Sequence, residues 1–208
     1  MDYQPLKYIY KASGTPEAYT LLLLHGTGGN EHDLIGLGAE FGSHINLLSV
    51  RGNVLEHGMP RFFKRLGMGV FDEQDLRFRT EELLTFIREI SAKEAFDSTK
   101  VIALGYSNGA NIAGALLVTH PDALAGAILF RPMPPYKELP SFTSADHVPL
   151  FVSSGQMDPT VDPESIQQYV AALTTGGFSV HHVTLPAGHN LSQQDLDLAK
   201  KWFDNEFR

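Results

Sequence analysis

Short, dense apolar runs alternate along this chain with stretches in which apolar residues recur at helical spacing. Strands that alternate with helices favour right-handed crossovers and a mostly parallel sheet with helices on both faces. The sequence therefore predicts an α/β fold with a twisted sheet, and its first and last strands read as edge strands. The expected strands are Leu6–Lys11, Tyr19–Leu24, Ile45–Val50, Val101–Leu104, Ala127–Phe130, Leu150–Val152 and Ser179–Leu185.

Four helices are expected between and after these strands. Proline in the first turn marks the start of one of them, and a weak capping box marks the start of the last. The longest interval without a predicted element runs from Arg51 to Thr80, and we interpret it as an irregular loop. No interval is long enough for a separate lid domain, so residues 1–208 are expected to form one domain. The expected helices are Thr80–Ala92, Asn108–Val118, Pro163–Leu173 and Ser192–Phe207.

Composition excludes several classes of function. The chain has 16 Lys and Arg against 24 Asp and Glu, a formal charge of −8, which disfavours nucleic acid or an anionic membrane surface as the main partner. It has no cysteine, so disulfides and thiolate catalysis are excluded. No apolar run approaches the roughly 20 residues that span a bilayer, and the N-terminus lacks the pattern of a signal peptide. We therefore expect a cytoplasmic protein without a membrane span.

The segment Gly105-Tyr106-Ser107-Asn108-Gly109 has the pattern G-x-S-x-G. Composition alone produces this pattern in some chains, so the bare motif is only suggestive. Here it lies between a predicted apolar strand and a predicted helix of small residues, which is the context that exposes a serine hydroxyl on a sharp turn. Ser107 is therefore the candidate nucleophile.

A serine nucleophile needs a general base, and in this fold the chain order is serine, acid, histidine. Catalytic groups gather at the carboxyl ends of the strands in such a sheet. Of the downstream histidines only His189 follows the carboxyl end of a predicted strand, so His189 is the candidate base. The others, which lie at the opposite end of the sheet or inside a strand, are His120, His147, His181 and His182.

The acid should follow the strand that lies between the serine and the histidine in sequence. Asp158 is the first choice, because it comes shortly after Leu150–Val152 and a carboxylate there can orient the imidazole. Asp162 is the alternative. It also suits the N-cap of the following helix.

Two N–H donors are expected to stabilise an oxyanion. The first is the amide of Asn108, directly after the nucleophile. The second should come from the glycine-rich loop His25–Asn30, where Thr27 is the candidate. Neither of the two common glycine-rich phosphate-binding patterns is present, which makes nucleotide binding a weak interpretation of this loop.

A metal site is not expected, although His25, His32 and Asp33 lie close together in the sequence. His25 ends a predicted strand in a His-Gly pair that suits the turn, and no second group of ligands has suitable spacing. The predicted chemistry requires neither a metal nor another cofactor.

Together these motifs resemble the phospholipase/carboxylesterase family of α/β-hydrolases over essentially the whole chain. The segments that carry the resemblance are Leu24–Gly29, Gly105–Asn111, Gly155–Asp158 and Gly188-His189. The stretch from residue 51 to 72 resembles small bacterial carboxylesterases associated with hydroquinone and catechol resistance. Asn108 stands where the acyl-protein thioesterase and lysophospholipase branch usually has glutamine, which weighs against long-chain lipid and acyl-protein substrates. The resemblance implies Ser107, Asp158 and His189 as the triad, a fold without a lid domain, and often a homodimer.

The substrate pocket is expected to border the interval from Arg51 to Thr80, because this interval follows a carboxyl end of the sheet. Its aromatic residues could equally be core residues. A second wall is expected from the loop after Ala127–Phe130. The candidate pocket residues are Met59, Arg61, Phe62, Phe63, Phe71 and Met133.

The predicted function is a serine carboxylesterase that hydrolyses small acyl esters, aryl esters and thioesters included, through an acyl-enzyme intermediate. We expect short acyl groups to be preferred, because no lid covers a long chain. Two alternatives stay open: an acyltransferase or perhydrolase with the same triad, and a non-catalytic protein of this fold that binds aromatic ligands.

Overall fold

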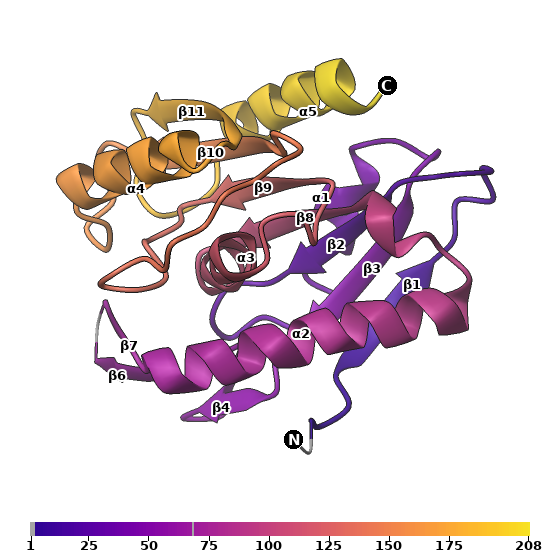
Figure 1. Cartoon of the computed structure of the whole chain (residues 1–208), viewed down its shortest axis with the longest axis horizontal. Helices are drawn as coiled ribbons and strands as arrows, with labels where there is room; N and C mark the ends of the chain where they lie inside the picture. The colour runs from indigo at the N-terminus through magenta and orange to yellow at the C-terminus, as the bar shows by residue number, and fades with distance from the viewer. Residues whose placement is uncertain (1–2, 68) are drawn as a thin grey trace.

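The computed structural model describes residues 3–67 and 69–208, and its centre is a seven-stranded sheet (Figure 1). The strands are β1 (Lys7–Lys11), β2 (Thr20–Leu24), β3 (Asn46–Arg51), β8 (Val101–Tyr106), β9 (Gly126–Phe130), β10 (Pro149–Gly155) and β11 (Ser179–Leu185). They lie in the order β1-β3-β2-β8-β9-β10-β11. Only the edge strand β1 is antiparallel to its neighbour. The predicted α/β fold is confirmed, with strand ends that differ by a few residues.

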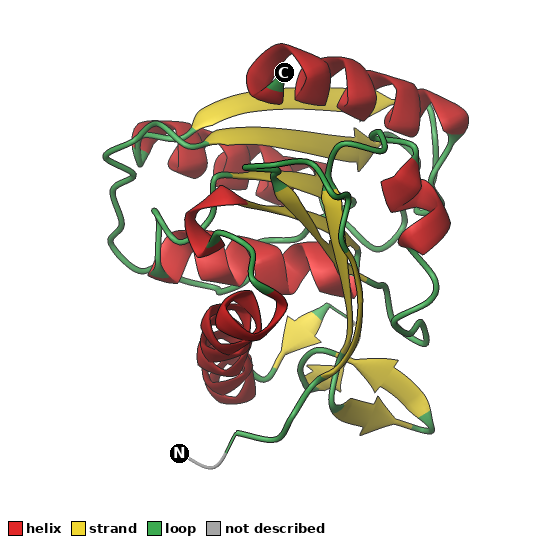
Figure 2. Cartoon of the chain, turned by 90° about the vertical axis from the view of Figure 1, so that its right-hand side faces the viewer, coloured by secondary structure: helices red, strands yellow, loops and turns green. Residues whose placement is uncertain are grey.

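Helices cover both faces of the sheet, as Figures 1 and 2 show. One face carries α2 (Glu73–Glu94), α3 (Asn108–Thr119) and α4 (Pro163–Thr175), and the other carries α1 (Ile35–Ala39) and α5 (Gln193–Phe207). The predicted capping box is present at the start of α5, between Ser192 and Asp195. Within the described residues, no helix is both long and apolar enough to cross a lipid bilayer.

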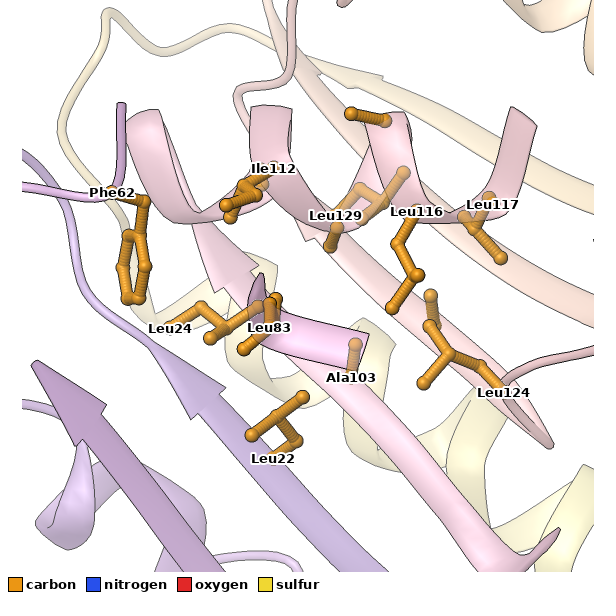
Figure 3. Packing of buried hydrophobic residues seen from close by; sticks show 14 of the residues in the cluster. Leu22, Leu24, Phe62, Leu83, Ala103, Ile112, Leu116, Leu117, Leu124 and Leu129 are labelled. Atoms are coloured by element: carbon orange, nitrogen blue, oxygen red, sulfur yellow. The ribbon is translucent and has the colours of Figure 1, made fainter. Parts of the chain in front are cut away.

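Strand β2 shows why the apolar runs are so dense. Leu22 and Leu24 point to the face covered by α2 and α3, whereas Leu21 and Leu23 point to the face covered by α5. Successive side chains of a strand alternate between faces, so a strand with both faces covered needs apolar residues at every position. Figure 3 shows Leu22, Leu24 and Ile112 in the layer between the sheet and α3.

The expectation of an irregular loop from Arg51 to Thr80 is wrong. Two small hairpins and the first turns of α2 occupy this interval. The first hairpin turns at His57 and Gly58, whose φ angles are 50° and 81°. Positive φ at both central residues is the geometry that suits a two-residue hairpin. The hairpin strands are β4 (Val54–Glu56), β5 (Met59–Arg61), β6 (Arg65–Gly67) and β7 (Val70–Phe71).

Helix α2 also begins earlier than expected. Asp72 caps it by accepting a hydrogen bond from the Asp75 amide at 3.1 Å, and the first turn is acidic. Leu76 and Thr80 are buried, so the inward-facing stripe continues to the true start of the helix. Because the first turn is polar, the apolar periodicity of the sequence did not reveal this part of the stripe.

Candidate active site

Ser107 lies on the sharp turn between β8 and α3, with φ 52° and ψ −111°. A non-glycine residue with these angles is strained and persists only where its surroundings enforce it. The flanking glycines are required by close packing. A Cβ on Gly109 would lie 1.9 Å from the Leu24 carbonyl oxygen, and one on Gly105 would lie 2.5 Å from the Gly109 oxygen. The motif therefore places a partly exposed serine at the carboxyl end of β8.

Three loops bring Ser107, His189 and Asp158 into contact. His189 Nε2 lies 2.9 Å from Ser107 Oγ, and His189 Nδ1 lies 2.7 Å from Asp158 Oδ2. The loops follow β8, β11 and β10, whose carboxyl ends meet at one edge of the sheet. A hydroxyl, an imidazole and a carboxylate in this chain of contacts can transfer a proton away from the hydroxyl.

Asp158 is buried and held in its ionised form. Its Oδ1 accepts hydrogen bonds from the Thr160 amide at 2.9 Å and from Thr160 Oγ1 at 2.7 Å. Burial alone would raise the pKa of Asp158, but the hydrogen bonds from Thr160 and His189 outweigh burial and hold this pKa below its ordinary value. Thr160 Oγ1 also lies 2.9 Å from His189 Nδ1. Thr160 was not among the predicted site residues.

The alternative acid and the other histidines lie elsewhere. Asp162 is exposed and accepts a hydrogen bond from the Ser165 amide at 2.8 Å, so it caps α4. His120 pairs with Glu81, and His147 contacts the Gly177 carbonyl. In β11, His181 packs on Phe151, while His182 contacts Ser154 Oγ. The described structure thus brings only Asp158 and His189 to Ser107.

Two backbone amides beside Ser107 are candidates for binding an oxyanion. Within the described residues, neither the Thr27 amide nor the Asn108 amide donates a hydrogen bond to a protein acceptor. Thr27, Asn108 and Ser107 all line one cavity, and Asn108 is the first residue of α3. Free amides at a helix start favour negative charge.

The side chains of two asparagines on α3 hold the loops that flank the nucleophile. Asn108 Oδ1 accepts a hydrogen bond from the Phe62 amide at 2.7 Å. Asn111, one turn further on, accepts one from the Met133 amide at 2.8 Å. The sequence signal for this pair of contacts is the three-residue spacing of the asparagines, because residues at i and i+3 share a helix face.

Arg131 anchors the loop that carries His189. It follows β9, its side chain is fully buried, and it forms two hydrogen bonds with the Asp195 carboxylate, at 2.7 and 2.8 Å. It also donates to the carbonyls of Gly188 at 2.9 Å and Asn190 at 3.3 Å, the residues on either side of His189. Burial would raise the pKa of Asp195, but its hydrogen bonds from Arg131 and Ser153 lower that pKa overall. Sequence gave no local sign of this long-range pair.

Ser107 opens into a cavity of about 420 Å³. Of the predicted pocket residues, Arg61, Phe71 and Met133 line it. A neighbouring cavity of about 460 Å³ shares Gly69, Phe71 and Met133 with it. The full lining of the cavity at Ser107 is Thr27, Arg61, Arg65, Gly69, Phe71, Ser107, Asn108, Asn111, Arg131, Met133, Pro159, Thr160 and His189.

The other predicted pocket residues do not line this cavity. Phe62 and Phe63 are 3% and 0% exposed and belong to the core beneath the hairpins, and Figure 3 shows Phe62 in this core. The Phe62 ring packs beside His25. Met59 is 40% exposed and its side chain lies beside Gly28. An apolar segment shows that its side chains pack somewhere, and only the tertiary structure shows which of them face the core.

His25 is engaged in hydrogen bonds through both ring nitrogens. Nδ1 lies 2.6 Å from the Gly26 carbonyl oxygen, and Nε2 accepts a hydrogen bond from the Gly52 amide at 3.1 Å. It therefore joins the loop after β2 to the start of the first hairpin. Among the described residues no group of three or more His, Asp or Glu side chains is arranged to hold a metal ion.

The chain is similar to proteins of one family over nearly its whole length. The family whose description is Phospholipase/Carboxylesterase matches residues 9–205. The protein MhqD of Bacillus subtilis (strain 168), which is named as a hydrolase, is 47% identical over 95% of this chain and 98% of its own. A crystal structure of the Bacillus cereus carboxylesterase is 41% identical, with a TM-score of 0.94 over 97% of this chain and 95% of that one. The structure of YahD with malic acid is 30% identical, with a TM-score of 0.91 over 97% and 100% of the two chains.

Proposed function

The chain belongs to the phospholipase/carboxylesterase family and is an ester hydrolase, and from this premise we propose that it is a serine carboxylesterase acting on small acyl esters through an acyl-enzyme on Ser107. The observation that carries the proposal is the contact chain from Asp158 through His189 to Ser107. The free amides of Thr27 and Asn108 beside it supply the oxyanion site that acyl transfer needs.

The reaction begins when Ser107 Oγ attacks the ester carbonyl and its proton moves to His189 Nε2. Asp158 holds Nδ1–H and so keeps Nε2 free to accept that proton. The Thr27 and Asn108 amides stabilise the oxyanion. As the tetrahedral intermediate collapses, the carbon–oxygen bond to the alcohol breaks, and the leaving oxygen takes the proton from Nε2. Water then attacks the acyl-enzyme by the same route, which releases the acid and restores Ser107.

Replacement of the nucleophile tests this proposal. We expect Ser107→Ala to abolish p-nitrophenyl acetate turnover and labelling by a fluorophosphonate probe, because Ser107 Oγ is the hydroxyl that contacts the proton-accepting Nε2 of His189. Ser179→Ala, at an exposed serine at the start of β11, is the matched control and should keep both. Labelling that persists in Ser107→Ala would refute the assignment. A wild-type protein that is never labelled would favour a non-catalytic ligand-binding role.

Two side chains in the wall of the cavity support a preference for short acyl groups. Phe71 and Met133 line the cavity at Ser107 where it adjoins the neighbouring cavity. A series of p-nitrophenyl esters should therefore give the highest kcat/KM at short acyl lengths, and a clear optimum at palmitoyl would contradict this. Competing acceptors in the same assay separate hydrolysis from acyl transfer or perhydrolysis. A cytoplasmic location and a homodimeric assembly stay predictions.

A further inference from the structure

The cavity at Ser107 has the opposite charge to the rest of the protein. The whole chain carries a formal charge of −8. Among the described residues that line the cavity there are three arginines, Arg61, Arg65 and Arg131, and no aspartate or glutamate. Asp158 lies behind His189 and is engaged by it. A cleft lined by one sign of charge concentrates ligands of the other sign.

One of the three arginines is neutralised. Arg131 faces the Asp195 carboxylate through two hydrogen bonds, so this pair adds no net charge to the cavity wall. The described contacts of Arg61 and Arg65 include the same carboxylate, that of Glu56. Arg65 Nε donates to Glu56 Oε1 at 2.9 Å, whereas Arg61 Nη1 lies 3.7 Å from Glu56 Oε2, too far for a hydrogen bond. Among the described residues Arg61 therefore has no hydrogen-bonded carboxylate, and its positive charge lies in the hairpin-side wall of the cavity.

Arg61 is held in place and keeps donor capacity. Its Nε donates to the Phe63 carbonyl at 3.2 Å and its Nη1 to Thr27 Oγ1 at 2.6 Å. Within the described part of the chain, Nη2 donates no hydrogen bond to another residue. Burial, and then the positive charge of Arg65, lower the pKa of Arg61. A guanidinium that has lost water and lies beside a like charge is stabilised by a bound anion, and its planar fork fits a carboxylate.

The position of Arg61 connects this charge to the reaction. The side chain that it holds belongs to Thr27, whose amide faces the cavity as an oxyanion donor. An anionic group bound at Arg61 and Arg65 therefore lies in the same cavity as the ester carbonyl that Ser107 attacks. We infer that Arg61 and Arg65 make this enzyme selective for esters that carry a carboxylate, such as half-esters of small dicarboxylic acids or esters of hydroxy acids. This inference rests on the proposed esterase function.

Two matched pairs of substrates test the inference. p-Nitrophenyl hydrogen adipate and the corresponding primary amide differ only in a charge on the acyl side. 4-Acetoxybenzoate and 4-acetoxybenzamide differ only in a charge on the alcohol side. For each pair, the value of kcat/KM for the charged ester is divided by the value for the neutral ester. This ratio is then divided by the ratio of the rates at which hydroxide hydrolyses the same two esters, which corrects for their intrinsic reactivity. We expect a ratio of about ten or more in at least one pair at low salt, because hydrogen bonds to charged groups are strong. It should fall as salt screens the charges.

Variants identify the residues responsible. Arg65→Gln should lower this ratio towards one. Arg61→Lys should lower it in part, because it keeps the charge and loses the planar fork. The matched control is Arg88→Gln, which removes one positive charge from an exposed position on α2 and should leave the ratio unchanged. Thermal unfolding shows whether each variant is folded. If Arg61→Lys is unstable, the variant at the partly exposed Arg65 and the salt dependence of the wild-type ratio still test the inference.

The outcomes separate the two proposals. A ratio near one in both pairs, or a ratio that neither Arg65→Gln nor Arg61→Lys changes, overturns the inference. If the neutral esters are still hydrolysed and Ser107 is still labelled, the esterase proposal stands without it. If no ester is hydrolysed and no probe labels Ser107, the proposed function itself is wrong.

Discussion

The edge of the sheet and the hairpin segment at residues 52–71 differ in how they are stabilised. At the sheet edge, Asp158 and Arg131 are buried, and several hydrogen bonds hold each of them. The hairpin segment exposes large apolar side chains, with Leu55 71% and Leu66 74% exposed. The buried sheet edge thus fixes the candidate catalytic groups, whereas the exposed hairpins shape the space in front of them.

Hydrogen bonds join the two regions, in addition to the apolar packing of Phe62 and Phe63 in the core. Asn108 accepts from the Phe62 amide, His25 accepts from the Gly52 amide, and Thr27 accepts from Arg61. Changes at the sheet edge should therefore affect every substrate, and changes in the hairpins should alter the choice among substrates.

The largest effect is expected at the acid. Asp158→Asn should lower kcat for p-nitrophenyl acetate by about 10⁴-fold, because an amide does not stabilise the imidazolium or hold the required tautomer. Asp162→Asn is the control, and it should leave kcat nearly unchanged, since asparagine also caps a helix well. The reverse result would exchange the roles of these two residues.

The second-largest effect is expected from breaking the buried pair of Arg131 and Asp195 at the sheet edge. Arg131→Met leaves the Asp195 carboxylate buried without its partner and should lower the free energy of unfolding by about 3–5 kcal/mol, measured by urea denaturation. The double variant Arg131→Met, Asp195→Leu should recover much of this loss. If the single variant were as stable as the wild type, Arg131 would not anchor the His189 loop.

A smaller effect is expected from the hairpin side. Phe71 lines both the cavity at Ser107 and the neighbouring cavity of about 460 Å³. Phe71→Ala should join the two cavities and raise kcat/KM for longer acyl esters, by about fourfold for each methylene that becomes buried. Leu66→Ala, at an exposed residue of the same segment, should leave the chain-length profile unchanged. A profile in Phe71→Ala that matches the wild type would show that this ring does not limit acyl length.

The smallest effect is a pH dependence of stability at the junction of the two regions. Burial lowers the pKa of His25 below the ordinary value of 6.5. The unfolded chain therefore binds a proton before the folded protein does, so the stability contributed by neutral His25 is complete above pH 6.5 and is lost as pH falls from there through the lowered pKa. His182, whose pKa burial also lowers, acts in the same direction.

Urea denaturation at a series of pH values measures this dependence. The slope of unfolding free energy against pH below about 6.5 should be smaller in His25→Asn than in the wild type. The exposed His32 provides the control, and His32→Asn should keep the wild-type slope. An unchanged slope in His25→Asn would show that burial does not hold His25 neutral in the folded protein.

Much of the fold could be predicted because its signals are local. Dense apolar runs mark strands with both faces covered, and Ser192 with Asp195 marks the start of α5 through contacts within one turn. The hairpins were not predicted, because short, partly exposed strands carry little apolar periodicity. The start of α2 was not predicted, because its first turn is acidic.

The sequence by itself determined the order of the candidate catalytic groups and the edge of the sheet from which each one comes. It left Asp158 and Asp162 as alternatives, and it treated Phe62, Phe63 and Phe71 alike. The tertiary structure decided these cases. It placed Asp158 against His189, turned Phe62 and Phe63 into the core, and paired Arg131 with Asp195. Local sequence sets backbone conformation and periodicity, but a contact between residues 64 positions apart depends on how the whole sheet packs.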